Sequence, residues 1–463
     1  MIDKTIYQSP FSWRYGSAEM RDIWSISRTR LLWRKIWSAL AEVQTSYGLV
    51  REDQAAMLAS QASNLDLERS LQLEKELKHD LMAELHVFAD QCPGAGGILH
   101  LGATSMDIKD NALIMQQVEA LGLILSRLKE LLGILSDRIL KGAETPLLGY
   151  THLQPAEPTT LGYRLAGYGQ DLLVGYQDLV GFSGQMKAKG FTGAVGTSAS
   201  FASLIGENNL LEFQDLMACK LGLEFFPVVN QTYPRLQDFQ LITRLAGIGG
   251  TLYRFAFDMR ILQSPGFGEV AEPFSTKQVG SSAMPFKQNP ILSEKINSLG
   301  RYLAQLPRIA WDNMAHSLLE RTLDDSANQR IYLPEAFLSL DEMVDAVVEI
   351  LSGLDIRSEM IKRNLKEHGS FLMTEKLLMD LVKAGGDRQE MHEIIRSHAL
   401  KAWDAVRKGD PNPLVESLSS DPAMLALLDE DRIRSHLDQE AYLGDAPERA
   451  KRLAGMIREE LEG

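Results

Sequence analysis

The stretch that decides the fold runs from residue 280 to residue 295 and reads GSSAMPFKQNPILSEK. Gly280 and Pro285 are typical of a loop rather than of the interior of a helix or strand. Asn289 followed by Pro290 predicts the N-cap and first turn of a helix. A loop with two serines and a lysine is therefore expected at a helix start, where exposed amides and a partial positive charge favour an anion.

Composition excludes several classes of protein. The chain has 463 residues, of which 45% are hydrophobic, enough for two or three domains or for one large core with extensions. A formal net charge of -14 argues against a general nucleic-acid partner, although a local cluster of arginines can still attract an anionic ligand. Two cysteines are too few for a disulfide framework and are typical of a reducing compartment.

Patterns for membranes, export and cofactors are also missing from the sequence. No stretch reaches 18 uninterrupted apolar residues, so we expect no membrane span. Residues 1–16 lack the basic and then apolar regions of a signal peptide. No cysteine and histidine set has zinc-site spacing, and there is no glycine-rich phosphate loop. We therefore expect a cytoplasmic protein without a metal or another cofactor.

Long helical patterns dominate the middle of the chain, and the short alternating runs of strands are absent. The apolar residues between Asp110 and Leu140 cover more than one side, as in the interior of a large bundle that a second copy of the chain completes in part. The sequence predicts an all-α fold with three helical domains: residues 1–104, a central long-helix bundle over 105–355 that builds a tetrameric core, and residues 356–463. The expected helices are 24–49, one from Leu65 that carries Lys78-His79-Asp80, Asp110–Leu140, Thr160–Lys187, Gln237–Leu262, Pro290–Leu306 and Pro334–Leu354.

Polar segments between these helices are the candidate functional positions. Thr104 and Ser105 precede a helix, where they serve either as plain caps or as donors to a carboxylate. The loop from Gly149 to Ala156 is expected to place His152 between two helices. The charged segment from Glu320 to Arg330 is either a solvated helix face or an element terminus that carries function. The stretch from Phe191 to Phe201 is rich in Gly, Thr and Ser.

Four features together resemble the fumarase/aspartase superfamily: Thr104-Ser105, a Thr-His-X-Gln-Pro loop at 151–155, a Gly-Ser-Ser-X-Met-Pro-X-Lys-X-Asn-Pro loop at 280–290, and the helices between them. Within the superfamily, Lys78-His79-Asp80 and residues 320–328 resemble the adenylosuccinate lyase family, in the animal form more than the common bacterial one. The resemblance covers nearly the whole chain. It implies a non-hydrolytic C–N β-elimination in purine biosynthesis, which releases fumarate from adenylosuccinate, giving AMP, and from succinylaminoimidazole carboxamide ribotide.

The resemblance also implies roles for single residues. Ser281 matches the family's base and His152 its acid, which Glu294 would orient. Lys287 would stabilise the serine alkoxide, and His79 would lie near the phosphate or carboxylates of the substrate. The positions that match substrate-binding residues of the family are Arg14, Tyr15, Lys78, Asp80, Thr104, Ser105, Gln231, Asn289, Lys295, Arg321, Ser326 and Arg330.

Two of these positions depart from the family pattern. Lys78 and Lys295 stand where arginines are usual, and a lysine lacks the bidentate fork of a guanidinium. The relative preference for the two purine substrates is therefore in question. The family further implies a homotetramer whose active sites are shared between subunits.

Three other interpretations compete with this one. Another fumarate-releasing lyase of the superfamily, such as argininosuccinate lyase, is disfavoured by the segment from Arg321 to Arg330. Acyl transfer by Ser281 and Lys287 would leave His152 and the arginines unexplained. A non-catalytic structural relative would not need the intact Ser281, His152 and Glu294. An assay with adenylosuccinate separates these possibilities.

Overall fold

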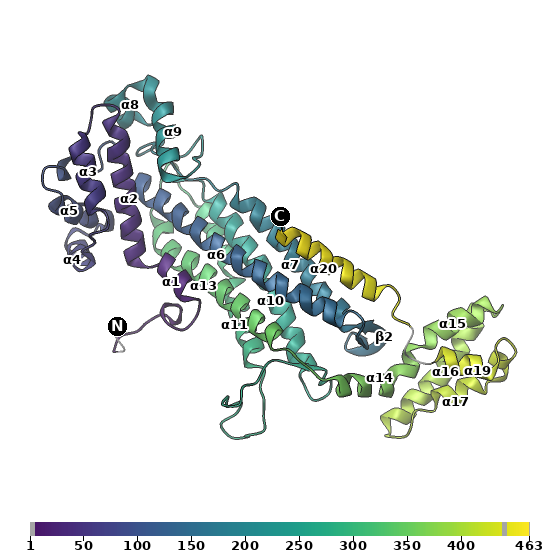
Figure 1. Ribbon diagram of the computed structural model, residues 1–463. Coiled ribbons are helices and arrows are strands. Elements are labelled where there is room, and N and C mark those ends of the chain that lie inside the picture. The colour runs from purple at the N-terminus through teal and green to yellow at the C-terminus, as the bar shows by residue number, and fades with distance from the viewer. Residues whose placement is uncertain (1–4, 438–441, 463) are drawn as a thin grey trace. The chain divides into compact units, whose positions relative to one another are not determined.

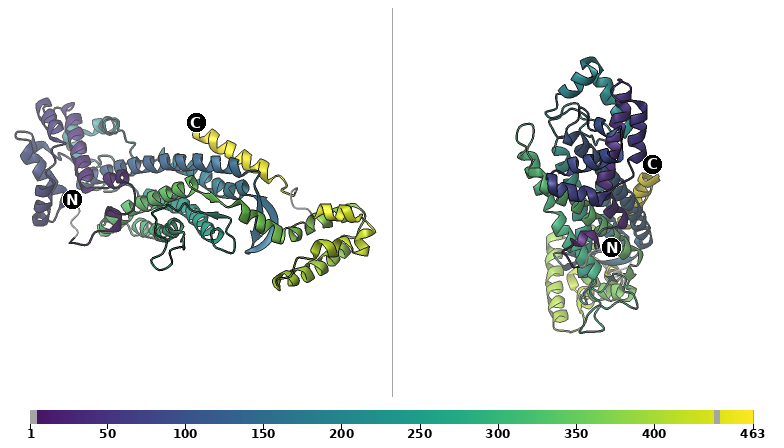
Figure 2. Two further views of the ribbon diagram at one scale, coloured as in Figure 1. Left: turned by 60° about the horizontal axis from the view of Figure 1, so that its bottom comes forward. Right: turned by 90° about the vertical axis from the view of Figure 1, so that its left-hand side faces the viewer.

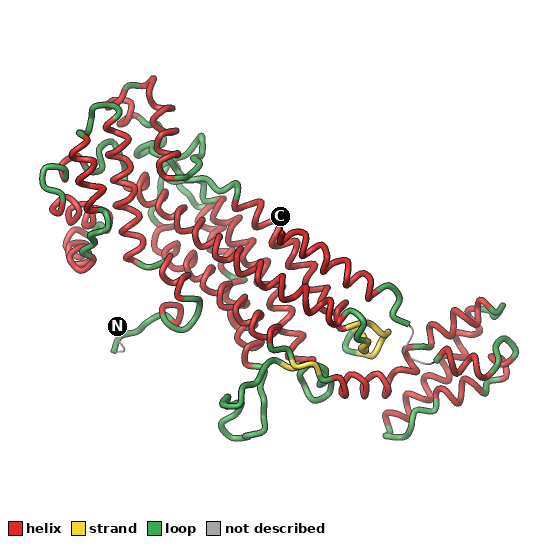
Figure 3. The backbone as a smooth tube through the Cα atoms, viewed as in Figure 1, coloured by secondary structure: helices red, strands yellow, loops and turns green. Residues whose placement is uncertain are grey.

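The computed structural model describes residues 5–437 and 442–462, and this part of the chain is predominantly helical (Figures 1 and 3). The predicted all-α class is confirmed. The N-terminal helices are α1 (Ala18–Ile23), α2 (Ile26–Thr45), α3 (Glu52–Gln61), α4 (Leu67–Leu77), α5 (Asp80–Gln91) and α6 (Ser105–Gly142). The middle helices are α7 (Leu161–Ser183), α8 (Ala199–Ile205), α9 (Leu210–Leu221), α10 (Leu236–Leu262), α11 (Ile291–Leu303), α12 (Leu306–Ala315) and α13 (Asp324–Ser352).

The C-terminal helices are short except for α14, α16 and α20, which have 15, 20 and 17 residues. They are α14 (Ser358–Leu372), α15 (Thr374–Lys383), α16 (Arg388–Arg407), α17 (Leu414–Ser419), α18 (Pro422–Leu425), α19 (Glu430–His436) and α20 (Ala446–Glu462). Three 3-10 turns are η1 (Pro10–Ser12), η2 (Gly96–Ile98) and η3 (Glu207–Asn209). The strands are β1 (Pro146–Thr151), β2 (Gln154–Thr160), β3 (Val270–Ala271) and β4 (Asp355–Ile356), which form two small antiparallel pairs.

Contacts between Cα atoms divide the chain into two compact units. Unit 1 consists of Met1–Leu128, Val174–Gly250 and Ser298–Asp345. Unit 2 consists of Lys129–Leu173, Thr251–Asn297 and Ala346–Gly463. Helices α6, α10 and α13 each contribute residues to both units. The division into three consecutive domains stays a prediction.

One part of the core of unit 1 is a cluster of aromatic side chains. Helix α2 begins after Ser25, whose Oγ accepts the amide of Arg28 at 3.0 Å, and it buries Trp33 and Trp37. The Trp37 ring lies against Phe88 of α5, with 6.3 Å between ring centroids. Because large aromatic side chains bury much apolar surface, this cluster holds the helices around it in place.

Within unit 1, parts of α6, α10 and α13 run side by side, as two views of the molecule agree (Figures 1 and 2). Gln117 on α6 donates to Asp238 on α10 at 2.8 Å, and Arg127 on α6 forms an ion pair with Asp341 on α13 at 2.8 Å. Burial of α6 on several sides is confirmed there, since consecutive buried residues point in different directions around the helix; they include Asn111, Ala112, Ile114, Gln116 and Gln117.

A β-hairpin replaces the loop that the sequence predicts around His152. Strands β1 and β2 pair from Pro146 with Thr160 to Thr151 with Gln154, and His152 and Leu153 form the turn with φ of 54° and 60°. Positive φ at both turn residues is the geometry that joins antiparallel strands with two residues. The expectation of a strand-free region is wrong here because the prolines of β2 hide the strand pattern. They are tolerated because both strands of a two-stranded sheet are edge strands.

Several predicted helix limits are also wrong. The helix expected from Leu65 stops at Leu77, because Lys78 has a left-handed backbone with φ of 55°, and His79 caps the following helix α5. Helix α13 begins at Asp324, ten residues before the predicted start at Pro334, which lies inside it. A proline inside a helix removes one backbone hydrogen bond, which burial in the core can offset. The predicted 24–49 helix is shorter in the structure, where α2 covers Ile26–Thr45 and the preceding α1 ends at Ile23.

Candidate functional site

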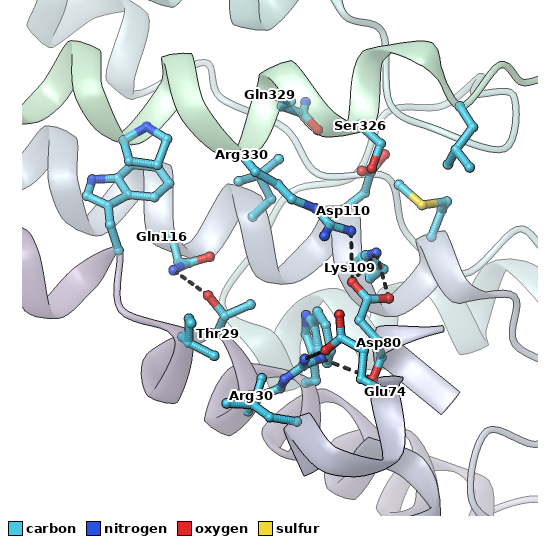
Figure 4. A pocket seen from close by; sticks show the side chains of 18 of the residues that line it. Thr29, Arg30, Glu74, Asp80, Lys109, Asp110, Gln116, Ser326, Gln329 and Arg330 are labelled. Carbon is cyan, nitrogen blue, oxygen red and sulfur yellow. Dashed lines mark hydrogen bonds and ion pairs between the residues drawn. The ribbon is translucent and has the colours of Figure 1, made fainter. Parts of the chain in front are cut away.

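A cavity of about 370 Å³ in unit 1 is bounded by α2, α4, α5, α6 and α13 (Figure 4). Four residues predicted from the sequence line it: Asp80, Arg321, Ser326 and Arg330. Trp24, Trp33, Leu71 and Leu113 are part of its apolar lining. The cavity therefore joins charged groups with an apolar wall, as sites for small organic anions do.

Asp80 connects the charged residues of the cavity. Its carboxylate accepts from Lys109 Nζ at 2.8 and 3.1 Å and from Arg330 Nη2 at 2.9 Å (Figure 4). Burial raises the pKa of Asp80, but the neighbouring Lys109 and Arg330 outweigh it, so that the pKa lies below its usual value. Asp80 is therefore ionised near neutral pH and orients two cations toward the cavity.

Two further cations of the cavity were missed by the sequence analysis. Arg30 donates to Glu74 at 2.6 Å and to the backbone carbonyl of Asp80 at 3.1 Å, and its guanidinium lies 4.3 Å from the Trp33 ring centroid. Burial lowers the pKa of Lys109, and the attraction of Asp80 opposes this effect. Lys109 lies one helical turn after Ser105 on the same face of α6, and that spacing was the available signal.

Arg321 is held at the start of α13 by a chain of charges. Its Nη1 donates to Asp325 Oδ1 at 2.9 Å, and Asp325 Oδ2 accepts from the buried Arg235 at 3.1 Å. Arg235 in turn forms an ion pair with Asp110 on α6 at 3.2 Å. The segment predicted as either a solvated helix face or an element terminus contains the start of α13, and the side chains of Ser326 and Arg330 on this helix line the cavity.

His79, Thr104 and Ser105 also belong to unit 1, at helix starts. The His79 Nδ1 accepts the amide of Met82 at 3.3 Å, so in the neutral ring Nε2 carries the proton. The amide of Thr104 donates to Asp107 Oδ2 at 2.8 Å, so the cap of α6 comes from Asp107. In the part of the chain that the structure describes, no hydrogen bond uses the hydroxyl of Thr104 or Ser105. Both hydroxyls can therefore face a ligand.

The remaining predicted residues of unit 1 do not line this cavity. Gln231 donates its side-chain amide to the carbonyl of Ala194 at 2.9 Å. The Arg14 guanidinium lies 5.7 and 5.8 Å from the ring centroids of Trp13 and Tyr15. Lys78 is exposed at the end of α4.

In unit 2, the loop from Gly280 to Pro290 is closed at its base. Asn289 donates its side-chain amide to the carbonyl of Gly280 at 2.8 Å. A Cβ added to Gly280 would lie only 2.0 Å from the carbonyl oxygen of Lys287, so only glycine fits there. Directly after Gly280, Ser281 Oγ accepts the amides of Ala283 and Met284 at 3.3 and 3.1 Å. This arrangement presents a serine oxygen that already receives two N–H donors.

The helix start after this loop is occupied by a carboxylate of the chain itself. Glu272, 4% exposed, accepts the amides of Leu292 and Ser293 at 3.0 and 3.1 Å and the Ser293 hydroxyl at 3.0 Å. Burial raises the pKa of Glu272. The expectation that this helix start, capped by Asn289, is open to an external anion is therefore wrong, because Glu272 satisfies its amides and Asn289 closes the loop instead.

The other predicted residues of unit 2 are separate in a single chain. Glu294 lies in the first turn of α11, with Oε1 3.9 Å from Arg260 Nη2. Lys295, half-buried, follows it, and Lys287 is exposed. Among the residues that the structure describes, no hydrogen bond or ion pair joins His152 to Ser281 or to Glu294.

Two properties of the described residues, 5–437 and 442–462, bear on the expected absences. None of their helices has the length and apolar character needed to cross a membrane. No group of three or more His, Cys, Asp or Glu residues among them is arranged to hold a metal ion.

Comparisons with known proteins point in one direction. The chain matches a lyase family over residues 34–302 and the adenylosuccinate lyase C-terminus family over residues 370–453. It is 37% identical over 422 residues to an adenylosuccinate lyase from Schistosoma mansoni, covering 90% of this chain and 88% of that one. It is 35% identical over 459 residues to the adenylosuccinate lyase of Schizosaccharomyces pombe, covering 97% and 94%. Among solved structures, a 3-carboxy-cis,cis-muconate lactonizing enzyme from Pseudomonas putida has a TM-score of 0.87 with 25% identity, covering 99% and 100%.

Proposed function

Since the chain belongs to the adenylosuccinate lyase family, we propose that its 280–290 loop carries the base of the elimination and that the cavity of unit 1 binds the nucleotide substrate. The chain is a carbon–nitrogen lyase that releases fumarate from adenylosuccinate in purine biosynthesis. The single observation that carries the site proposal is the meeting of Asp80, Arg321, Ser326 and Arg330 in one cavity.

The reaction requires three kinds of group. A base removes a proton from the carbon next to a carboxylate, and the electron pair is held on that carboxylate as an aci-acid. The C–N bond then breaks, fumarate forms, and an acid protonates the departing nitrogen. Atoms and charges balance because the proton taken from carbon is replaced by one given to nitrogen.

Ser281 is the proposed base. A serine hydroxyl is a poor base unless its alkoxide is stabilised, and hydrogen bonds to the charged form favour that form. The amides of Ala283 and Met284, which donate to Ser281 Oγ at 3.3 and 3.1 Å, support this role. The exposed Lys287 of the same loop would add positive potential once the site closes around the substrate.

His152 is the proposed acid, and its place in the chain supports a shared active site. The turn of the β1–β2 hairpin presents His152 to solvent, and among the described residues no hydrogen bond joins it to Ser281 or Glu294. We therefore propose a homotetramer in which different subunits supply His152 and Ser281, with Glu294 orienting His152. Helices α7 and α10 expose Val174 at 57% and Phe257 at 46%, apolar area that a second copy would cover.

The cations of unit 1 suit the charge of the substrate. Adenylosuccinate carries two carboxylates and a phosphate, about four negative charges at neutral pH. Arg321 and Arg330 can each make charge-assisted hydrogen bonds to such groups, and Ser326 can donate one more. The other proposed contacts of the substrate are Thr104, Ser105, Arg14, Tyr15, Gln231, His79, Lys78 and Lys295. With lysine at the last two positions, we propose that the balance between the two purine substrates differs from that of arginine-containing relatives.

The cytoplasm is the proposed location of the enzyme. Among the described residues, both cysteines, Cys92 and Cys219, are free thiols, and Cys219 is exposed. Free exposed thiols are typical of a reducing compartment.

One assay tests the function directly. The purified protein is incubated with adenylosuccinate and, in parallel, with argininosuccinate, and the release of fumarate is followed by absorbance. We expect turnover of adenylosuccinate alone, because the argininosuccinate molecule lacks the nucleotide that the cavity is proposed to hold. Turnover of argininosuccinate without adenylosuccinate would identify a sister lyase instead.

Replacing Arg330 by alanine is expected to weaken substrate binding. A lost charge-assisted contact costs about 1.5–3 kcal/mol, so KM should rise by about tenfold to a hundredfold while kcat changes less. Lys109 would still neutralise Asp80, at 2.8 Å, so the fold should persist. Arg308→Ala is the matched control, since Arg308 is 74% exposed and pairs with Asp312 outside the cavity. Equal KM in both variants would make Arg330 structural only.

Replacing Gly280 by alanine is expected to abolish most turnover without lowering the melting temperature. The new Cβ would lie 2.0 Å from the Lys287 carbonyl oxygen, so the loop must open and displace Ser281. A displacement of about 1 Å can cost about 10²-fold in rate. Gly266→Ala serves as the control, because a Cβ there meets nothing within 4 Å. Equal kcat values in the two variants would contradict the loop geometry.

A further inference from the structure

We propose that the buried ion pair of Asp107 and Lys189 is a positioning element that holds three substrate-binding segments of unit 1 in register. The inference rests on the proposed function, because that function assigns Thr104 and Gln231 to the substrate. Both side chains of the pair are 0% exposed. A buried pair of this kind is costly to desolvate and is held in place only where further hydrogen bonds satisfy it.

The carboxylate of Asp107 receives donors from two different segments. The amide of Thr104, at the start of α6, donates to Oδ2 at 2.8 Å. The amides of Thr192 and Gly193, from the segment rich in Gly, Thr and Ser, donate at 3.2 and 3.3 Å. One buried charge therefore fixes the backbone on both sides of it.

The ammonium of Lys189 completes the arrangement from the other side. Besides Asp107, its Nζ donates to Thr192 Oγ1 at 3.0 Å and to the carbonyl of Gly193 at 3.3 Å. Asn111 adds a clamp on the next residue, because its side chain exchanges bonds with the backbone of Gly190 at 3.0 and 3.1 Å. All three donors of the ammonium are directed to groups within the protein.

The segment positioned in this way reaches two further parts of the proposed site. The carbonyl of Ala194 accepts the side-chain amide of Gln231 at 2.9 Å. The backbone amide of Gln231 donates to the carbonyl of Glu320 at 3.1 Å, next to Arg321. A continuous set of contacts thus runs from Thr104 through the Asp107–Lys189 pair to Gln231 and Arg321.

The pair has features that stability alone does not explain. A buried ion pair can often be replaced by apolar residues of similar volume without loss of stability. Leucine and methionine, however, could not accept the three backbone amides that Asp107 accepts. Substrate-binding segments would then lose their common anchor even in a protein that folds well.

The test uses the full-length enzyme with the double substitution Asp107→Leu/Lys189→Met. We expect KM for adenylosuccinate to rise by about tenfold or more, as for one lost charge-assisted contact, with a smaller change in kcat. The matched control is Arg34→Met/Glu84→Leu, which removes another pair that is 0% exposed on both sides in unit 1. Loss of folded protein lowers the apparent kcat but not KM, so a merely structural role would leave KM unchanged in both.

Three companion measurements keep the outcomes distinct. The single variant Lys189→Arg retains the charge of the pair, so its KM should lie closer to the wild-type value than that of the double variant. If the double variant does not fold, hydrogen exchange of residues 190–197 in the wild-type protein decides, with slow exchange expected and full exchange within seconds overturning the proposal.

Thr104→Val and Gln231→Leu test the site itself. If they raise KM and the folded double variant stays within twofold of wild type, the positioning inference fails alone; if they do not, the substrate-binding assignment fails.

Discussion

Ser281→Ala is expected to lower kcat by about 10²–10⁴-fold and to leave KM for adenylosuccinate nearly unchanged. The substitution removes one hydroxyl from an exposed loop whose closure depends on Gly280 and Asn289. The folded structure should therefore keep its thermal stability, and substrate binding by the arginines should persist. Steady-state kinetics with adenylosuccinate and a thermal unfolding curve measure the two parts of this expectation.

Ser282→Ala is the control for this experiment. Its side chain is exposed, in the same loop, and within the described residues it makes no hydrogen bond like those of Ser281. Turnover should remain close to wild type in this variant. Near-wild-type turnover of Ser281→Ala, or an equal loss in both variants, would remove Ser281 from the role of base.

Mixing two inactive variants is expected to restore about a quarter of wild-type activity. His152→Ala and Ser281→Ala should each be nearly inactive, since each removes one group of an acid–base pair worth about 10²–10⁴-fold. If the two groups of one site come from different chains, a mixed tetramer can contain intact sites. Such a site takes His152 from a Ser281→Ala chain and Ser281 from a His152→Ala chain. With equal, random exchange the chance is one half for each donor, or about one quarter of the sites.

Exchange of subunits must be shown separately in this experiment. Native mass spectrometry of differently tagged chains reports whether mixed tetramers form. Each parent variant, taken alone through the same dissociation and reassociation, sets the background activity. Mixed tetramers with activity at that background would contradict a site shared between subunits.

The sequence by itself determined the helical architecture and the family. Long apolar repeats, as between Asp110 and Leu140, predict long helices because apolar residues recur every three or four positions, the period of an α-helix. The loop 280–290 carries the family resemblance because its glycine, serines and lysine are close together in the chain. Local patterns of this kind need no tertiary information.

Tertiary structure alone decided where polar groups find their partners. Arg330 donates to Asp80, 250 residues earlier in the chain, and no local pattern announces such a pair. From the sequence, the start of α11 was expected to be open to an external anion. Glu272 occupies it instead, because a buried carboxylate can satisfy the free amides of any nearby helix. Lys78 ends a helix with a left-handed backbone that its residue type does not favour.

The hairpin that carries His152 shows the same limit. The prolines of β2 argue against a strand, and only the two-stranded sheet, in which every strand is an edge, makes them acceptable. Sequence patterns report the period of burial along one element, whereas caps, ion pairs and edges depend on neighbours brought close by folding. The chain therefore determined which helices form, and their packing decided which charges meet in the cavity of unit 1.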